Sequence, residues 1–280
     1  MVSGRWHRYL VQIAMAMKIA LLALLNRFPL LKRALKGMRN RLFSSNYIAL
    51  QANEASAEGQ RLRAAWHDEA MPQKQRELVE QQLRHYRGGA RIEVYDVFVD
   101  SLLQLPDLAP GMSLLEIGCS SGFYSEVMDI AGLSLKYFGC DYAPAFIELA
   151  RSKYPALDFQ VEDGTNLRYA DREFDIVVSG CCLLHIPEYA RAVTETARVA
   201  RRYAIFHRTP VVWGQPEQWY RKQAYGVETV EIHFNEPEFL ALLDRNSLEL
   251  IATHTLSEES ADASRTQGRA SRTYVCRKKD

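Results

Sequence analysis

The chain has 280 residues, of which 48% are hydrophobic and 25% are charged, close to the averages of soluble globular proteins. This length allows one or two domains with a full core, and the composition excludes a disordered polymer, a collagen-like fibre and a polytopic membrane protein. The formal net charge of +1 is the sum of two unequal parts. Residues 1–53 hold nine Lys or Arg and no acid, whereas the rest of the chain holds 26 bases against 34 acids. A +9 arm therefore precedes a −8 body.

Residues 1–53 combine an apolar stretch with a basic amphipathic one. The apolar stretch, 9–25, is interrupted by Gln12 and Lys18 and falls short of the ~20 residues that a membrane-spanning helix needs. Residues 29–43 place apolar and basic side chains on opposite helical faces, which is typical of a helix lying on anionic lipid. We therefore expect a basic amphipathic helical arm on a membrane surface. A helical pair capping the domain, or a mitochondrial transit peptide, would have a similar pattern.

The pattern of the arm does not indicate nucleic-acid binding. Its aromatic residues are not interleaved with the basic ones, as a surface that stacks on bases and binds phosphates requires. The five cysteines are odd in number, and their spacing matches neither a disulfide framework nor a zinc site. We interpret them as buried residues in a reducing cytosol and expect no metal. The predicted location is cytoplasmic, with peripheral attachment to the membrane.

Residues 54–105 are mostly polar. We expect them to form helices that cover the following domain, with one helix ending at Gly88 and Gly89. Trp66, His67, Tyr86 and Tyr95 of this segment are candidates for substrate recognition. From residue 106 onward, short apolar runs alternate with helical patterns. Strands that are apolar on both faces and alternate with helices indicate a parallel sheet covered on both sides. We expect strands at 114–117, 137–140, 157–161, 174–179 and 203–207, then a helix at 236–246 and strands at 248–255 and 273–277 around a polar loop.

The sharpest motif is LLEIGCSSGFYSEV, residues 114–127, where a strand turns at Gly118 and reaches Gly122 as a helix begins. Glycines at such a turn let the backbone approach a ligand closely. Ser120 stands where a dinucleotide-binding GxGxxG motif has its middle glycine, which counts against a nicotinamide oxidoreductase. Asp141 ends the next strand and is placed to accept the hydroxyls of a ribose, and Asp163 with Gly164 follows the third strand.

These motifs, in this order and spacing, resemble a class I S-adenosylmethionine-dependent methyltransferase over roughly residues 110–280. The resemblance implies a Rossmann-like α/β fold with helices on both faces. It implies a seven-stranded, mostly parallel sheet of order 3-2-1-4-5-7-6, whose last strand is antiparallel. We expect an arm at 1–53, a cover at 54–105 and a methyltransferase domain at 106–280. The cofactor would be S-adenosylmethionine, bound by these residues: Glu116, Gly118, Cys119, Gly122, Asp141, Tyr142, Asp163, Gly164, Ser179 and Cys181.

Two histidines follow predicted strands near the expected methyl position and are candidates for a general base. His185 follows the fourth strand and His207 ends the fifth. A hydroxyl acceptor usually needs such a base, whereas an amine or a thiolate does not. For either histidine, a hydrogen bond to the backbone beneath the pocket is an alternative role.

The segment after the fifth strand, 211–235, is long and mixes aromatic with polar residues, which suits stacking on a sugar or ring beside an anion contact. Its candidate substrate residues are Trp213, Trp219, Tyr220, Arg221 and Tyr225. We expect an enzyme that methylates a small-molecule acceptor at the membrane face, on an oxygen of a lipid-linked or surface-glycan precursor. A quinone or another lipid is the alternative acceptor, and a non-catalytic binding protein of the same fold is the alternative class. Nothing in the sequence indicates the oligomeric state.

Overall fold

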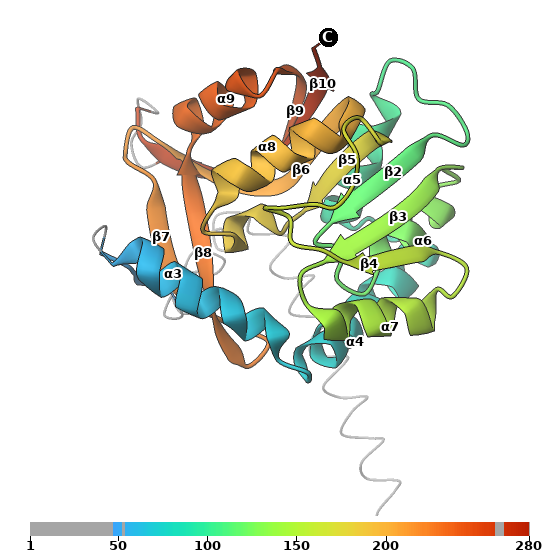
Figure 1. Ribbon diagram of the computed structural model, residues 1–280, viewed down its shortest axis with the longest axis horizontal. Coiled ribbons are helices and arrows are strands. Elements are labelled where there is room, and N and C mark those ends of the chain that lie inside the picture. Colours follow the sequence, from blue (N-terminus) through green and yellow to red (C-terminus); the bar gives the residue numbers. More distant parts are fainter. Residues whose placement is uncertain (1–46, 52–53, 261–265, 280) are drawn as a thin grey trace, which may run out of the picture. The chain divides into compact units, whose positions relative to one another are not determined.

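A computed structural model describes residues 47–51, 54–260 and 266–279 (Figure 1). The chain divides into two units, 1–47 and 48–280, and the described residues other than Tyr47 lie in the second. The predicted membrane-binding helices of the arm lie outside the described residues. Within the described ranges, no helix is both long enough and apolar enough to cross a bilayer.

The described chain alternates strands and helices from β2 onward. The strands are β1 (Tyr47–Ala49), β2 (Ser113–Ile117), β3 (Lys136–Asp141), β4 (Asp158–Val161), β5 (Phe174–Gly180), β6 (Ala200–Trp213), β7 (Gln218–Ala224), β8 (Val227–Asn235), β9 (Leu248–Ser260) and β10 (Gly268–Lys278). The α-helices are α3 (Ala55–Arg63), α4 (Met71–Arg87), α5 (Glu93–Leu103), α6 (Phe123–Ile130), α7 (Pro144–Lys153), α8 (Tyr189–Val199) and α9 (Glu236–Arg245), with short 3₁₀ turns η2 (Ala64–His67) and η3 (Leu183–His185).

The central sheet has the order β4-β3-β2-β5-β6-β10-β9, which is the predicted order 3-2-1-4-5-7-6. Strands β2 to β6 run parallel, whereas β10 is antiparallel to both β6 and β9. The predicted Rossmann-like fold class is therefore confirmed. The carboxyl ends of β2, β3, β4 and β5 meet at one side, which we call the carboxyl edge of the sheet (Figure 1).

The strand count differs from the prediction, because β1, β7 and β8 add to the seven strands. The strand predicted at 203–207 extends as β6 to Trp213, where Val211 pairs with Phe234 of β8. The predicted insertion 211–235 is thus mostly a β-hairpin that widens the sheet. Its period-2 pattern explains this, since alternate residues Val230, Ile232 and Phe234 are all buried. The predicted loop 257–271 is also shorter than expected, since β9 continues to Ser260 and β10 begins at Gly268.

Two hydrophobic layers cover the two faces of the sheet. One layer joins alternate residues of β5 and β6, such as Val177 and Phe206, to Val193 of α8 and Leu243 of α9. The other joins Ile176 of β5 to apolar residues of α4, α5, α6 and α7. Helices therefore cover both faces, as predicted, and the ends of the parallel strands remain for polar residues.

The segment 54–105 is helical, but its tyrosines do not form a substrate surface. Tyr95 is 1% exposed and packs against Tyr124, with ring centroids 6.0 Å apart. Tyr86 packs against Tyr95 in turn, at 5.3 Å. These two rings belong to the core between α4, α5 and α6, because an amphipathic helix buries its large apolar side chains first. Of the four aromatic candidates in this segment, only Trp66 and His67, on η2, reach the carboxyl edge, as described below.

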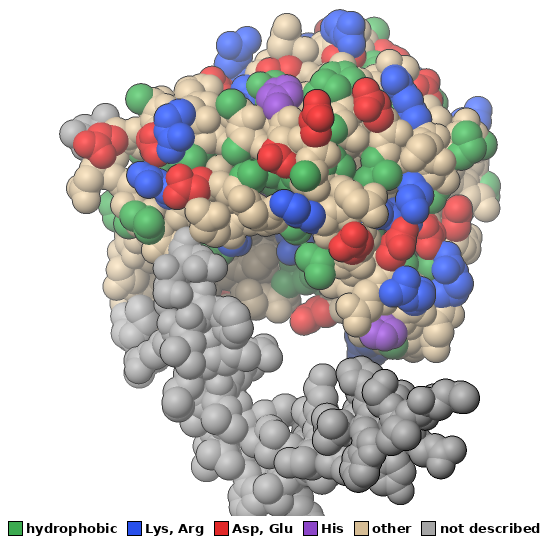
Figure 2. Space-filling view, turned by 90° about the horizontal axis from the view of Figure 1, so that it is seen from below, with side chains coloured by type: hydrophobic (Ala, Val, Ile, Leu, Met, Phe, Trp, Pro, Cys, Tyr) green, Lys and Arg blue, Asp and Glu red, His purple; other side chains and the backbone are tan. Residues whose placement is uncertain are grey.

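Acidic and basic side chains are intermingled over the described surface in Figure 2, so on this face the acidic excess of the body does not form one patch. Most ion pairs of the described residues are at least partly exposed, such as Arg277–Glu249. The carboxylate of Glu231, in contrast, is buried. Glu231 of β8 accepts hydrogen bonds from Lys222 Nζ of β7 at 2.6 Å and from His233 Nε2 at 3.0 Å. Burial alone would raise the pKa of Glu231, but His233 and Lys222 together lower it to about 2.

Replacing Glu231 with glutamine is expected to lower the free energy of unfolding by about 3 kcal/mol at pH 7, because the folded state holds the carboxylate more than two pKa units below its ordinary value. A depressed pKa stabilises the fold above the ordinary pKa of 4.5, and this stabilisation disappears as the pH falls towards 2. Urea denaturation at pH 7 and pH 3 measures both effects. Glu249→Gln, which removes an exposed ion pair, is the control and should change stability by less than about 1 kcal/mol. Equal losses in the two variants would contradict this prediction.

Candidate cofactor and substrate site

The glycine-rich turn after β2 is packed against the loop that follows β5. Gly118 has a φ of +71°, and a Cβ atom there would lie 2.3 Å from Cys182 Cβ. The amides of Gly118 and Cys119 both donate to the carbonyl of Cys140 at the end of β3, and Cys119 is fully buried. Gly122, with a φ of +73°, starts α6. A side chain at Gly118 would separate the ends of β2 and β5, so glycine is required for this close approach.

Ser120 departs from the usual glycine pattern but fits the turn. Its φ is +53°, in the left-handed region, and its amide donates to Asp141 Oδ2 at 2.9 Å. Its hydroxyl hydrogen-bonds to Gln75 of α4. Two polar contacts therefore hold a conformation that is costly for a residue other than glycine. The link from the turn to the helical cover through Gln75 was not predicted, since nothing distinguishes Gln75 within a polar helix.

Asp141 joins the turn to the start of α7. Besides the amide of Ser120, its carboxylate accepts the amide of Ala143 at 3.0 Å. Burial raises the pKa of Asp141 to about 6, although the amides of Ala143, Ser120 and Tyr142 oppose this. The side chain stays partly exposed, so part of its hydrogen-bonding capacity remains for a ligand. The ring of the next residue, Tyr142, lies in a cation–π contact with Arg63, at 4.4 Å.

Asp163, which follows β4, is paired with an arginine of the helical cover. Its Oδ1 accepts the amide and hydroxyl of Thr165 and also Nη2 of Arg63, at 2.7 Å. Burial would raise the pKa of Asp163, but the contacts with Thr165 and Arg63 lower it below its usual value. Gly164 lies beside Ile117, so the end of β4 reaches the end of β2. The contact of Arg63 with a predicted cofactor residue is a second feature that the sequence did not indicate.

Glu116 lies beneath the turn rather than at its surface. It is 1% exposed and accepts a hydrogen bond from the hydroxyl of Tyr137 on β3. Burial raises the pKa of Glu116 well above its usual range, although the hydrogen bond from Tyr137 opposes this, so burial favours the neutral carboxylic acid. A Cβ atom at Gly180 would lie 2.3 Å from Glu116 Oε1. Glu116 therefore supports the ends of β2 and β5 from within the core.

The end of β5 and the loop after it hold two of the predicted cofactor residues, Ser179 and Cys181, together with Cys182. Ser179 is buried, and its hydroxyl lies 3.3 Å from Cys182 Sγ. Cys182 Sγ also donates to the carbonyl of Ile117, at 3.2 Å. Cys181 is partly exposed and has a φ of +63°. Ser179 and Cys182 thus hold the loop to β2, while Cys181 retains accessible surface at the carboxyl edge.

His185, in η3, has one ring nitrogen anchored and the other available. Its Nδ1 lies 2.6 Å from the carbonyl of Val230 on β8, and a carbonyl only accepts, so Nδ1 carries the proton. Nε2 then carries a lone pair, and no described residue hydrogen-bonds to it. Burial lowers the pKa of His185 below its usual value, so the ring is neutral at pH 7. A neutral imidazole with a free Nε2 has the form that a general base requires.

His207 of β6 is placed differently, and its contacts do not support the predicted catalytic role. It is 1% exposed, with Nδ1 2.9 Å from the hydroxyl of Thr273 and Nε2 2.9 Å from the hydroxyl of Tyr124. Burial lowers the pKa of His207 to about 3, so the ring is neutral. Both nitrogens are engaged, which leaves neither for a substrate. The sequence could not separate the two histidines, because both follow strands of the same sheet.

His207→Leu is expected to lower the free energy of unfolding by about 2–4 kcal/mol, because it removes the imidazole partner from two buried hydroxyls, those of Thr273 and Tyr124. Chemical denaturation monitored by circular dichroism measures this. His85→Leu, at an exposed position of α4, is the control and should change stability by less than about 0.5 kcal/mol. If His207→Leu were as stable as the control, the buried network would contribute nothing.

Residues of η2 lie over the carboxyl edge and contact both ends of it. The ring of Trp66 is 4.7 Å from His185 and 6.4 Å from Phe146 of α7. His67 packs edge-on against Tyr142 at 4.3 Å. The indole Nε1 of Trp66 and the hydroxyl of Ser121, in the turn, are buried and have no hydrogen-bond partner among the described residues. Buried polar atoms are rarely left unpaired, so these two atoms suit a ligand with hydrogen-bonding groups at this edge.

The predicted substrate residues separate into two groups. Trp213 and Trp219 are packed within the protein: Arg272 lies over the ring of Trp213 at 5.4 Å, and Trp219 packs against Gly59 of α3. Tyr220 packs against His233, at 4.9 Å. Arg221 is paired with Glu58 at 3.3 Å and Glu228 at 3.8 Å. These contacts occupy the side chains that were expected to meet a sugar ring or an anion.

Tyr225 differs from the other four. It lies in the turn between β7 and β8, with a φ of +51°, and packs with Trp66 against the cluster formed by Met71, Ala143 and Phe146. That cluster adjoins Asp141 and Tyr142, so the structure brings Tyr225 to the carboxyl edge. The sequence does not separate the two tryptophans from Tyr225, because large aromatic residues serve core packing and ligand stacking equally well.

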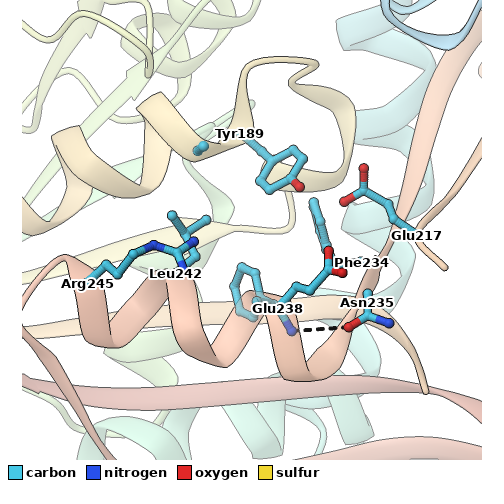
Figure 3. A pocket seen from close by; sticks show the side chains of 9 residues that line it. Tyr189, Glu217, Phe234, Asn235, Glu238, Leu242 and Arg245 are labelled. Atoms are coloured by element: carbon cyan, nitrogen blue, oxygen red, sulfur yellow. Dashed lines mark hydrogen bonds between the residues drawn. The ribbon is translucent and has the colours of Figure 1, made fainter. Parts of the chain in front are cut away.

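A separate hollow of about 110 Å³ lies between the start of α8, the end of β8 and α9 (Figure 3). Tyr189, Glu217 and Arg245 are among its lining residues. Asn235 caps α9 there by accepting the amide of Glu238 at 3.1 Å (Figure 3). None of the predicted cofactor, catalytic or substrate residues lines it, so this hollow is distinct from the carboxyl edge.

Comparison with known proteins identifies the segment that carries these features. Residues 115–207 match the family described as a methyltransferase domain. A probable S-adenosylmethionine-dependent methyltransferase of Mycolicibacterium smegmatis is 30% identical over 96 residues, covering 34% of this chain and 37% of that protein. A phosphoethanolamine N-methyltransferase of Triticum aestivum is 36% identical over 107 residues, covering 36% and 19%. A demethylmenaquinone methyltransferase of Paenarthrobacter aurescens is 28% identical over 95 residues, covering 34% and 37%.

The chain thus matches little more than a third of the length of the first of these relatives. Among solved structures, a S-adenosylmethionine-dependent methyltransferase from Methanosarcina mazei is 20% identical, with a TM-score of 0.47, over 61% of this chain and 94% of that one. The family match begins within β2 and ends at His207 in β6, and so it spans every strand end that bears a predicted cofactor residue. Residues 115–207 thus form a methyltransferase domain, and this match supports a class I S-adenosylmethionine-dependent methyltransferase.

Proposed function

We propose that the chain transfers a methyl group from S-adenosylmethionine to an oxygen of a small-molecule acceptor, with His185 as general base. When bound, the cofactor supplies a methyl group on a positively charged sulfur, which is a strong electrophile. The residues at the carboxyl edge suit such a ligand. Asp141 retains acceptor capacity for ribose hydroxyls, and the unpaired Ser121 hydroxyl and Trp66 Nε1 lie beside the turn and over it.

The observation that carries the proposal for oxygen is the state of His185. Its Nδ1 is held by the carbonyl of Val230, and its lowered pKa keeps Nε2 unprotonated at pH 7. A hydroxyl acceptor loses a proton as the methyl group is transferred, and Nε2 can take it. An amine acceptor would need no such base, so a neutral histidine at this position favours oxygen over nitrogen.

For the acceptor, we propose a lipid-linked or surface-glycan precursor that is reached from the membrane surface through the basic arm, residues 1–53. The arm's nine basic residues and lack of acids support this. A quinone is the second candidate, because one relative is a demethylmenaquinone methyltransferase and the arm suits a lipid-dissolved acceptor equally. A binding protein that has lost catalysis would bind the cofactor without turnover.

The test compares acceptors under one set of conditions. Purified protein is incubated with S-adenosylmethionine labelled in its methyl group, and with either lipid-linked glycan precursors or a demethylated quinone in vesicles. Transfer to the glycan fraction supports the proposed acceptor, and transfer to the quinone replaces it with the second candidate. Calorimetric binding of S-adenosylhomocysteine with no transfer to any acceptor would instead support the non-catalytic alternative.

Membrane attachment is tested separately, on the full-length chain. A variant in which the nine Lys and Arg residues of the arm are replaced by Gln keeps the chain length and removes the charge. Flotation with vesicles containing anionic lipid should recover the unmodified protein but little of the variant, because each basic residue near the surface contributes about 1 kcal/mol. Equal recovery of both proteins would contradict a membrane role for the arm.

A further inference from the structure

Arg208 occupies a distorted position of β6. Phe206 pairs with Tyr274 and Thr209 with Arg272, so two residues, His207 and Arg208, face the single residue Thr273 of β10. This is a β-bulge, a feature that is common beside functional sites because it redirects a side chain. Arg208 has a φ of +58°, which is unfavourable for a residue other than glycine. Its amide donates to the hydroxyl of Thr273 at 3.3 Å.

The bulge lies at the carboxyl edge of the sheet. The pairing of β6 with β5 ends at His207, opposite Gly180, and its pairing with β8 begins only at Val211. Arg208 therefore falls in the interval between the two neighbours of β6, next to the point where β5 ends. The groups that act most strongly on its guanidinium are Cys181, Tyr124 and Tyr225, and together they raise the pKa of Arg208 against the effect of burial.

Arg208 has no acidic partner in the described part of the chain. No Asp or Glu oxygen of residues 47–51, 54–260 or 266–279 lies within 4.0 Å of its guanidinium. Residues 1–53 contain no Asp or Glu at all and cannot supply one. The other arginines near the carboxyl edge differ, since Arg63 is paired with Asp163 and Arg221 with Glu58. A partly buried guanidinium that has no carboxylate partner among the described residues is costly.

We infer that Arg208 binds a carboxylate or phosphate group of a ligand at the carboxyl edge of the sheet. This inference rests on the proposed function and adds the chemical class of one bound group. A planar guanidinium binds both kinds of anion with two parallel hydrogen bonds. The anion has two sources: the carboxylate of the cofactor's own methionine part, or an acidic group of the methyl acceptor. Arg221, the arginine expected to meet an anion, is already engaged within the protein.

The experiment uses full-length wild-type protein, Arg208→Gln and, as matched control, Arg202→Gln. Arg202 lies on the same strand but is paired with Asp107 at the far end. Calorimetry first measures S-adenosylhomocysteine and its decarboxylated analogue, which lacks only the carboxylate. Inorganic phosphate and acetate are then titrated, at constant ionic strength, into each protein with and without saturating S-adenosylhomocysteine.

If the anion is the cofactor's carboxylate, wild type and Arg202→Gln should bind S-adenosylhomocysteine about tenfold or more tightly than the analogue, and Arg208→Gln should bind both alike. If it is the acceptor's acidic group, the S-adenosylhomocysteine complexes of wild type and Arg202→Gln should bind phosphate or acetate, and that of Arg208→Gln should not. The inference is overturned if neither difference depends on Arg208. Failure of S-adenosylhomocysteine to bind wild type would overturn the proposed function instead, while the titrations without it still test Arg208.

Thermal unfolding separates anion binding from a structural role. Phosphate should raise the melting temperature of wild type but not of Arg208→Gln, because a ligand stabilises only the protein that binds it. In the absence of anions, Arg208→Gln should melt at or above the wild-type temperature, since the variant no longer buries an unpaired charge. If Arg208→Gln melted several degrees below wild type and phosphate still raised its melting temperature as much as that of wild type, the guanidinium would serve packing rather than binding.

Discussion

Replacing His185 with alanine is expected to lower the rate of methyl transfer to a hydroxyl acceptor by about 10²–10⁴-fold. The reason is the loss of the unprotonated Nε2, which the contact of Nδ1 with the carbonyl of Val230 makes available. The loss should appear in kcat, because the base accepts the proton in the transition state and does not contribute to substrate binding. Single-turnover transfer of the labelled methyl group measures it directly.

His185→Gln is the matched variant, because its side-chain amide can still donate to the carbonyl of Val230 but cannot accept a proton. It should lose nearly as much activity as His185→Ala while binding S-adenosylhomocysteine like the wild type. A near-normal rate in either variant would remove His185 from the role of base and would favour an acceptor that needs none, such as an amine.

Asp141→Asn is expected to weaken the binding of S-adenosylhomocysteine by about 10²-fold or more. Each hydrogen bond from a ribose hydroxyl to a charged acceptor contributes about 1.5–3 kcal/mol, and the amide retains only one acceptor oxygen. That oxygen is also needed by the amides of Ser120 and Ala143, which now share the carboxylate. Calorimetric titration of wild type and variant measures the difference.

The matched control is Asp175→Asn. Asp175, on β5, accepts the amide of Ser113 at the opposite edge of the same sheet, so the substitution disturbs a similar contact far from the turn. It should leave the affinity for S-adenosylhomocysteine unchanged. If both variants bound as well as wild type, Asp141 would be only a structural link between the turn and α7.

The affinity should also depend on pH through Asp141. Burial raises its pKa to about 6 in the ligand-free protein, above the ordinary 3.8, so the folded state holds a proton that the unfolded state has lost between these values. This group's contribution to the stability of the fold therefore falls as the pH rises from about 4 to 6.

Ligand binding changes in the opposite direction. Binding needs the ionised form of Asp141, so the affinity for S-adenosylhomocysteine should decrease by up to about tenfold per pH unit below pH 6. Asp141→Asn should abolish this dependence.

Much of the fold was predictable because its signals are local. Helix α6 begins directly after Gly122, as the sequence predicts, and the parallel strands β2, β3 and β5 lie within one residue of their predicted bounds. Apolar runs bounded by glycine or acidic residues leave few alternatives to a buried parallel strand. The hairpin β7–β8 was less visible. Its alternating buried residues Val230, Ile232 and Phe234 are interleaved with charged and aromatic ones that resemble a binding loop.

The partners of the polar residues were not predictable in the same way. Arg208 and Arg221 are both arginines after the predicted fifth strand. Within the described ranges only Arg221 meets carboxylates, because α3 brings Glu58 to it from 163 positions earlier in the chain. His185 and His207 likewise differ only in what the folded chain places beside them. Contacts of this kind join residues that are distant in sequence, so neither the periodicity nor the motif spacing of the sequence indicates them.

The sequence by itself determined the layered α/β fold, the order of its central strands and the positions of the glycine-rich turn and its acids, since each depends on short-range pattern and backbone chemistry. It also determined the separation of a +9 arm from a −8 body. Only the tertiary structure decided which histidine keeps a free nitrogen and which arginine lacks a counter-charge, in both cases with respect to the described residues, and which aromatic residues are buried. The physical reason is that charge, tautomer and exposure are set by neighbours in space, and these neighbours come together only when the chain has folded.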